Sequence, residues 1–130
     1  MRAAVAAAGP AAPDVVWDRY IHPGRWHEWS PQILAVDYPD DTLRAGGSGT
    51  VRGPCRIAVD FEVLAIDSEK HCWSWRVSVA GITLEMAHGV EAVIDPGAAA
   101  TRTTLDITGP APIVLGYLPI ARLALGRLVR

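Results

Sequence analysis

Hydrophobic and polar residues alternate through most of the chain between residues 33 and 108. In the stretch CWSWRVSV, residues 72–79, Trp73 and Trp75 fall on one face of the chain and Arg76 falls on the other. A period of two is typical of β-strands with one buried face. It predicts a meander of strands joined by short polar turns, over residues 33–39, 50–53, 56–67, 72–79, 82–94 and 101–108. Such a meander indicates an antiparallel sheet.

The segment before this meander has helical spacing instead. PDVVWDRYI, residues 13–21, begins with a proline suited to the first turn of a helix, and its hydrophobic residues recur at helical intervals. The following HPG ends the helix, because a residue before proline is disfavoured in helical conformation. RWHEWS, residues 25–30, forms one or two further turns. There Trp26 and Trp29 share one side and press onto the sheet, while the residues between them stay in solvent.

A longer helix is predicted at the end of the sequence, over residues 113–129. At helical spacing its apolar face gathers Val114, Tyr117, Ala121, Leu125 and Leu128. Pro119 removes one backbone hydrogen bond and predicts a kink or an interruption. The segment is too short and too charged for stable membrane insertion, which needs about 20 apolar residues. We therefore expect its apolar face to lie in the curved sheet.

Composition indicates one domain, residues 1–130, with no affinity for nucleic acid. Half of the residues are hydrophobic and 20% are charged, and the net charge of −2 comes without any basic stripe. The alanine-rich start is shorter and less hydrophobic than a secretory signal, so we interpret residues 2–8 as a first strand. Cys55 and Cys72 then indicate reduced thiols and a cytoplasmic location.

The predicted order is a strand, two short helices, a six-stranded meander and a long helix. This α+β order indicates a helix-grip fold, in which a seven-stranded curved antiparallel sheet wraps around the C-terminal helix. The opening AAPDVVWDRYIHPGRWHEWSP resembles that of the SRPBCC (START-like) superfamily, in its polyketide cyclase/dehydrase branch. The segments AGGSGTVRG, WSWRV and HGVE and the tyrosine-bearing last helix extend the resemblance over essentially the whole chain.

The resemblance implies a deep, largely apolar cavity for a hydrophobic small molecule, with no cofactor. Some members cyclise or dehydrate aromatic polyketide intermediates and others only bind lipids, sterols or hormones, and the fold does not decide between these activities. Two functions therefore stay open: a cyclase/dehydratase that acts on a ketone-rich or aromatic intermediate, and a non-catalytic carrier. A third, docking onto a partner through the helix at 113–129, has less support. We expect a monomer or a homodimer.

Alternation assigns side chains to the implied cavity. The expected ligand-binding residues are Phe61, Trp73, Trp75, Met86, Leu105 and, at the cavity floor, Trp26. Two tryptophans on one face of one strand are placed to stack on a flat aromatic ligand. The alternative is that these side chains are simply hydrophobic core.

His88 is the outlier among the inward-facing residues. Desolvation holds a buried imidazole neutral, which suits a general base near neutral pH. The Tyr117 hydroxyl is a donor for a substrate carbonyl. These two residues are the predicted catalytic pair: His88 takes a proton alpha to a carbonyl that Tyr117 polarises, and an aldol-type cyclisation and dehydration follow. The alternative is a core histidine with its hydrogen bonds satisfied and a tyrosine that packs at the cavity mouth.

Other motifs do not predict chemistry. No set of cysteine, histidine and carboxylate residues has the spacing of a metal site, so we expect no metal. The AGGSG segment lacks the lysine of a phosphate-binding loop and is interpreted as a flexible connection between strands.

Overall fold

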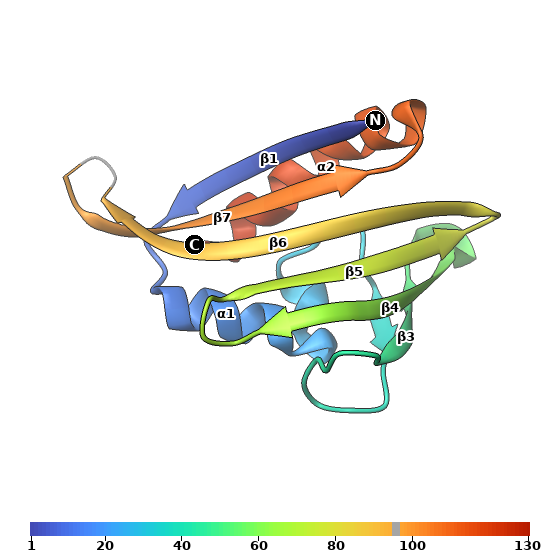
Figure 1. Cartoon of the computed structure of the whole chain (residues 1–130), viewed down its shortest axis with the longest axis horizontal. Helices are drawn as coiled ribbons and strands as arrows, with labels where there is room; N and C mark the ends of the chain where they lie inside the picture. Colours follow the sequence, from blue (N-terminus) through green and yellow to red (C-terminus); the bar gives the residue numbers. More distant parts are fainter. Residues whose placement is uncertain (95–96) are drawn as a thin grey trace.

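The computed structural model describes residues 1–94 and 97–130. Within them, seven strands form one antiparallel sheet in the order β1-β7-β6-β5-β4-β3-β2 (Figure 1). The strands are β1 (Arg2–Gly9), β2 (Ala35–Asp37), β3 (Ser48–Arg52), β4 (Ala58–Asp67), β5 (Cys72–Val79), β6 (Ile82–Ile94) and β7 (Ala99–Thr108). Strands β2 to β7 pair in chain order, and β1 pairs with β7. The beginning and the end of the chain are thus brought to one edge of the sheet.

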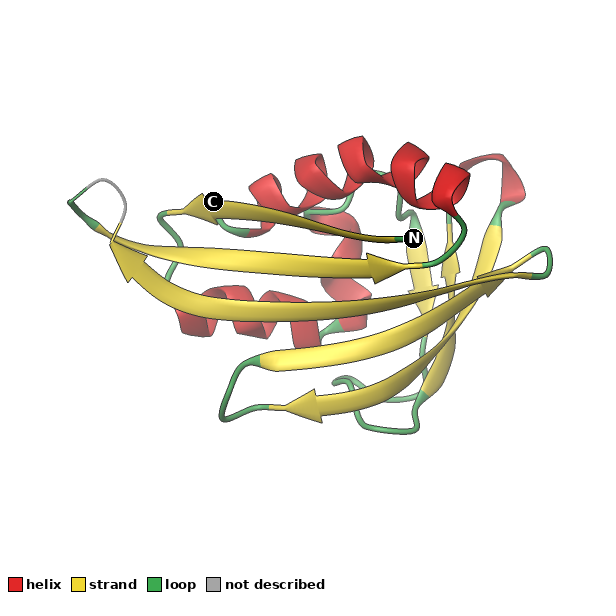
Figure 2. Ribbon diagram, turned by 45° about the horizontal axis from the view of Figure 1, so that its top comes forward, coloured by secondary structure: helices red, strands yellow, loops and turns green. Residues whose placement is uncertain are grey.

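Helices cover one side of this sheet. They are the α-helices α1 (Pro13–Ile21) and α2 (Ala111–Leu128) and the 3-10 helices η1 (Pro23–Glu28) and η2 (Pro54–Arg56). α1 contacts β6 and β7, whereas α2 runs along β1 and also contacts β7. In Figure 1, α2 lies behind β1 and β7, and Figure 2 shows it along one border of the curved sheet. The architecture is the predicted helix-grip fold.

Alternation predicted most strand positions closely, because it reports which side chains are buried. β5 and β6 have the predicted bounds. β1, β4 and β7 differ from prediction by one or two residues at one end, and β3 differs by one or two residues at both ends. The exception is the strand predicted over 33–39, of which Ala35–Asp37 alone pairs. β2 is an edge strand whose one neighbour among the described residues is β3, so its ends are less firmly held.

α2 is longer than expected and continuous. It starts two residues before the predicted position and runs through Pro119, so of the predicted kink or interruption the interruption does not occur. Pro119 is on the exposed side of the helix, where the loss of one hydrogen bond to the Leu115 carbonyl is compatible with continuity. The inner face is buried largely as predicted, at Val114, Ala121, Leu125 and Leu128, with Ala124 in addition and with Tyr117 only half-buried.

A β-bulge interrupts the pairing of β4 with β5. The pairing with β5 shifts between Val63 and Ala65, so that Val63 lies opposite Trp75 and Ile66 lies opposite Trp73. The extra residue restores an inward position for Ile66, which strict alternation from Val63 would have turned outward. The bulge therefore aligns both indoles of β5 with apolar partners.

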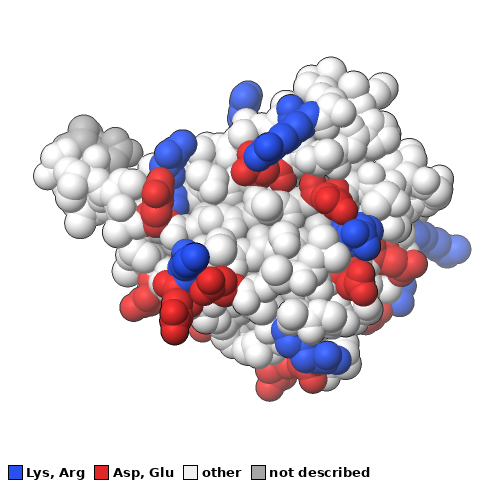
Figure 3. Space-filling view, in the orientation of Figure 1, with Lys and Arg blue, Asp and Glu red and all other residues white. Residues whose placement is uncertain are grey.

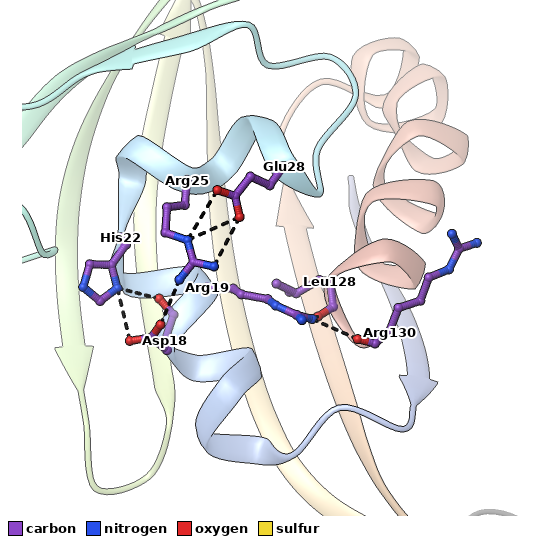
Figure 4. A network of polar contacts seen from close by, with 7 residues as sticks. All are labelled: Asp18, Arg19, His22, Arg25, Glu28, Leu128 and Arg130. Atoms are coloured by element: carbon purple, nitrogen blue, oxygen red, sulfur yellow. Dashed lines mark hydrogen bonds and ion pairs between the residues drawn. The ribbon is translucent and has the colours of Figure 1, made fainter.

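Surface contacts hold the helices to one another (Figure 4). The Arg25 guanidinium lies 3.1 Å from Asp18 and 3.2 Å from Glu28, which joins η1 to α1. Arg19 donates to the Leu128 carbonyl oxygen at 2.6 Å and so joins α1 to the end of α2. Each exposed ion pair stabilises the fold little. Together these contacts fix η1 and the end of α2 relative to α1.

Charge is dispersed over the face seen in Figure 3, where acidic and basic side chains alternate without a patch of one sign. By length and composition α2 does reach the range of a membrane-spanning helix, contrary to expectation, and 28% of it is buried. Its inner face packs against β1 and β7, as in a helix of a folded domain. Cys55 and Cys72 are free thiols, and the cytoplasmic location stays a prediction.

Candidate functional site

A small uncharged cavity lies between α2 and the aromatic residues of the sheet and η1. Its volume is about 40 Å³, enough for one or two water molecules. Its walls come from η1 and the loop after it, from β5, from β7 and from α2. The lining residues are Trp26, Trp29, Ser30, Gln32, Ile33, Trp73, Trp75, Leu105, Tyr117, Ala121, Ala124 and Leu125.

η1 and the residue that follows it place two of the indoles in this wall. Trp26 and Trp29 are buried while His27 and Glu28 are exposed, as the spacing predicted. The Trp26 indole N–H donates to the Tyr20 carbonyl oxygen at 2.8 Å, which fixes η1 against the end of α1. The HPGRWHEWSP stretch is thus a wedge between helix and sheet, and it is also one wall of the cavity.

The two indoles of β5 complete an aromatic cluster with η1. The Trp26 ring lies 5.7 Å from the Trp73 ring and 5.2 Å from the Trp75 ring, measured between centroids. Phe61 packs edge-on against Trp75 at 5.4 Å from outside the cavity lining. Aromatic pairs at such distances stabilise one another beyond the burial of their area. The cluster is therefore a rigid side of the cavity.

A polar contact spans the cavity from the loop after η1 to α2. The Gln32 side-chain amide donates to the Tyr117 hydroxyl at 2.9 Å. Burial raises the pKa of Tyr117, with this hydrogen bond as a smaller opposing effect, so the phenol stays protonated. Its own hydrogen remains available as a donor. The Tyr117 hydroxyl therefore lies at the cavity, as the sequence predicted.

His88 lies outside the lining, in a buried chain of hydrogen bonds. The Trp75 indole N–H donates to His88 Nε2 at 3.0 Å, and His88 Nδ1 lies 3.2 Å from the Tyr20 hydroxyl. The Tyr20 hydroxyl in turn lies 2.5 Å from Thr103 Oγ1, which donates to the Gly89 carbonyl oxygen at 3.0 Å. The chain thus links α1 to three neighbouring strands.

The direction of each bond follows from its two ends. The Gly89 carbonyl can only accept and the Trp75 indole can only donate. Thr103 has used its hydrogen, so Tyr20 donates to Thr103 and accepts from His88 Nδ1. This assignment requires a neutral imidazole with its hydrogen on Nδ1. Burial lowers the pKa of His88 to about 3, in agreement with a neutral ring.

This arrangement limits what His88 can do chemically. The single lone pair of its neutral ring is on Nε2, which already accepts from Trp75. The ring is also stacked on Trp73, with centroids 4.7 Å apart and planes 10° apart. A general base needs a free lone pair within reach of a substrate proton. In this conformation His88 has none, and its catalytic role stays a prediction.

The structure brings some of the predicted site residues together and separates others. Those in the lining are Trp26, Trp73, Trp75, Leu105 and Tyr117. Phe61, Met86 and His88 face inward and are buried, but they lie outside the lining. Among the described residues, no group of three histidine, cysteine or carboxylate side chains is close enough to hold a metal ion.

Sequence reasoning missed several lining residues. Trp29 was predicted only as a wedge, and Gln32 was not considered, although a polar residue just after WSP was a usable signal. Tyr20 carried no signal for its bond to His88, which joins residues 68 apart in the sequence. The small side chain of Ala121 was visible on the predicted inner face of the helix, whereas Ala124 was not assigned to that face.

The family model described as "Polyketide cyclase / dehydrase and lipid transport" matches residues 3–130. The chain belongs to this family. The resemblance seen in the sequence is thereby confirmed over nearly the whole chain. Proteins of this family bind hydrophobic ligands. No curated protein gives a significant sequence match.

Solved structures share the fold of this family member at low sequence identity. Ara h 8.0201 has a TM-score of 0.73 at 11% identity, over 98% of this chain and 94% of that one. The protein XoxI from Bacillus cereus has a TM-score of 0.79 at 13% identity, over 99% and 93% of the two chains. At such identities the likeness establishes the fold and leaves ligand and activity open.

Proposed function

We propose that this protein binds a hydrophobic small molecule in the cavity between α2 and the aromatic cluster. The observation that carries the proposal is the lining, which is rich in indole rings, has no charged side chain and is closed by a helix. Ligand sites are typically concave and apolar, with a few polar groups that fix orientation. The family membership supports the same class of ligand.

Binding requires the cavity to enlarge. A volume of about 40 Å³ is far below that of an aromatic ligand, since a cavity for benzene measures about 150 Å³. α2 is the movable wall in this proposal, because two of the side chains that it places at the cavity, Ala121 and Ala124, are small. The Gln32–Tyr117 hydrogen bond joins this wall to the loop after η1. We infer that a ligand enters as this bond opens.

Titration with the neutral fluorescent probe 1-aminoanthracene tests the proposal. An Ala124→Phe variant places a ring in the cavity from α2 and should lose most of the binding. Leu123→Phe is the matched control, because Leu123 is next in sequence but 48% exposed on the outer face of the helix. Equal binding by both variants would place the probe elsewhere and contradict the proposal.

A cyclase or dehydratase activity is the second candidate, favoured by the Tyr117 hydroxyl at the cavity wall. In this reaction the Tyr117 hydroxyl donates a hydrogen bond to a substrate carbonyl. His88 Nε2 gives up its hydrogen bond from Trp75 and takes the proton alpha to that carbonyl, which leaves an enolate. Turnover of a poly-β-ketone, followed by its ultraviolet absorbance, tests it. Tyr117→Phe and His88→Gln variants should each slow the reaction at least tenfold. Unchanged rates in both variants would leave binding as the function.

A further inference from the structure

Three buried polar atoms share one place in the molecule. Among the described residues, the buried side-chain nitrogens and oxygens without a hydrogen-bond partner are Trp29 Nε1, Trp73 Nε1 and Gln32 Oε1. All three side chains line the cavity next to α2. Both tryptophans are more than nine-tenths buried, at 9% and 4% exposure. A buried donor left unpaired costs about 1–3 kcal/mol, so this coincidence needs an explanation.

The neighbouring polar groups show that the protein can satisfy indoles in this core. Trp26 donates to the Tyr20 carbonyl and Trp75 donates to His88 Nε2. The rings of both unpaired indoles pack edge-on against the Tyr20 ring, at centroid distances of 5.7 Å for Trp29 and 5.8 Å for Trp73. Both side chains also line the same cavity, so their unused N–H groups belong to one site.

The type of the unpaired atoms defines the complementary ligand. Indole nitrogens only donate, so the ligand must present an acceptor oxygen to them. Gln32 Oε1 only accepts, and a carboxylate beside it would be repelled. The lining also lacks a cation that would offset the desolvation of an anion. The ligand oxygen is therefore a neutral one.

We propose that Trp29 and Trp73 form the polar end of the ligand site and hold the carbonyl oxygen of a neutral, otherwise apolar molecule through their indole N–H groups. The proposal rests on the proposed binding function and names the chemical class of its ligand. Trp26 and Leu105 supply the apolar wall beside this polar end. The Gln32 oxygen accepts from a hydroxyl of the ligand where one is present.

Nuclear magnetic resonance of the full chain labelled with ¹⁵N-tryptophan tests this directly. The chain has five tryptophans and so gives five indole N–H signals. The probe is 1-indanone, and indane is its match without the oxygen. Addition of 1-indanone should move the indole hydrogen signals of Trp29 and Trp73 downfield relative to their positions in the titration with indane. The Trp26 and Trp75 signals already report protein hydrogen bonds and should not share this difference.

Affinity gives a second readout that does not depend on assignment of the spectrum. We expect 1-indanone to bind about tenfold more tightly than indane, the effect of one net hydrogen bond. Trp29→Phe and Trp73→Phe variants should each reduce this preference, measured as the ratio of the 1-indanone affinity to the indane affinity. Trp17→Phe is the matched control, because Trp17 is buried against His71 away from the cavity and should keep the full preference.

The outcomes separate the two proposals. Equal affinity for 1-indanone and indane, with identical indole shifts, would mean that an ordered water alone satisfies the indoles. That result overturns the carbonyl assignment and leaves the apolar site intact. Tighter binding of the anion indane-1-carboxylate than of 1-indanone would also overturn it. If neither indane nor 1-indanone binds, the proposed function itself fails and the assignment fails with it.

Discussion

Two groups of buried polar atoms meet at Trp73 and differ in one respect. On one side, the chain from Trp75 through His88 and Tyr20 to Thr103 gives every donor an acceptor. On the other side, the cavity leaves three polar atoms unpaired. Trp73 belongs to both, since its ring stacks on His88 while its N–H has no partner. A fully satisfied network specifies a core, whereas unpaired donors around a space indicate a site for something else.

This difference changes where chemistry is expected. His88 drew attention in the sequence because it is a lone histidine on an apolar face. In the structure both of its ring nitrogens are hydrogen-bonded, while unpaired polar atoms lie on less conspicuous residues, among them Trp29 and Gln32. Substitutions in the hydrogen-bonded group should therefore lower stability, whereas substitutions at the cavity should chiefly alter binding.

Removal of the central imidazole should have the largest effect. His88→Ala leaves the Trp75 N–H without an acceptor, takes one hydrogen bond from the Tyr20 hydroxyl and opens a void, so we expect a loss of about 3–5 kcal/mol in the free energy of unfolding. Urea denaturation followed by circular dichroism measures it. His88→Gln is the control, because its amide offers an acceptor and a donor and should recover part of the loss. A loss below about 1 kcal/mol in His88→Ala would mean that the hydrogen bonds through His88 do not stabilise the core.

Acid should destabilise the protein through the same residue. The pKa of His88 is about 3 in the folded state because of burial, against 6.5 when unfolded. Below pH 6.5 the unfolded protein binds a proton at His88 that the folded protein does not bind. The free energy of unfolding is therefore unaffected by the titration of His88 above pH 6.5 and decreases as the pH is lowered toward 3. At pH 5 the loss is about 2 kcal/mol.

The measurement is a urea series between pH 7 and pH 5, compared with the His88→Gln variant. The variant lacks the ionisable group, so its stability should fall by about 2 kcal/mol less over this range. Working above pH 5 keeps most carboxylates ionised in both proteins. Parallel curves for the two proteins would show that His88 is protonated in the folded state, contrary to the bond directions assigned here.

The two indoles of β5 offer a matched comparison on one strand. Trp75→Phe and Trp73→Phe remove the same atoms, but only the first leaves a buried partner, His88 Nε2, unpaired. We expect Trp75→Phe to cost about 1–2 kcal/mol more in unfolding free energy than Trp73→Phe, measured by urea denaturation. If Trp73→Phe were the more damaging, its N–H would have a structural partner and the cavity would lose its main evidence as a site.

The sequence predicted the frame of both groups but not their difference. Alternation located Trp73, Trp75 and His88 on inward faces of adjacent strands, since a period of two reports burial directly. The side-chain rotamers in the packed core decide which indole hydrogen-bonds to the His88 imidazole. The alternation of hydrophobic and polar residues carries no information about rotamers. The partner of His88 on the other side, Tyr20, comes from α1 and was brought there by tertiary packing alone.

The same limit applied to the cavity. Helical spacing placed Trp26 and Trp29 on one side of a turn. It could not predict that the Trp26 indole donates to the Tyr20 carbonyl oxygen and that the Trp29 indole has no hydrogen-bond partner. The position of Gln32 depends on the loop after η1, where there is no periodicity to read. A regular pattern thus gives the side of an element that is buried. Hydrogen-bond satisfaction requires the coordinates.

The smallest effect on stability, and the most informative about entry, is expected at the contact that closes the cavity. Tyr117 is half-buried, so Tyr117→Phe should change the free energy of unfolding by less than about 1 kcal/mol. The variant loses the acceptor for the Gln32 amide, and α2 is then joined to the loop after η1 by packing alone. Stopped-flow association of 1-aminoanthracene should therefore be faster in the variant than in the native chain.

Tyr38→Phe is a control, because Tyr38 hydrogen-bonds the Arg44 backbone outside the cavity lining. Equal association rates for Tyr117→Phe and the native chain would show that the hydrogen bond does not limit entry, and that some other contact of α2 closes the cavity.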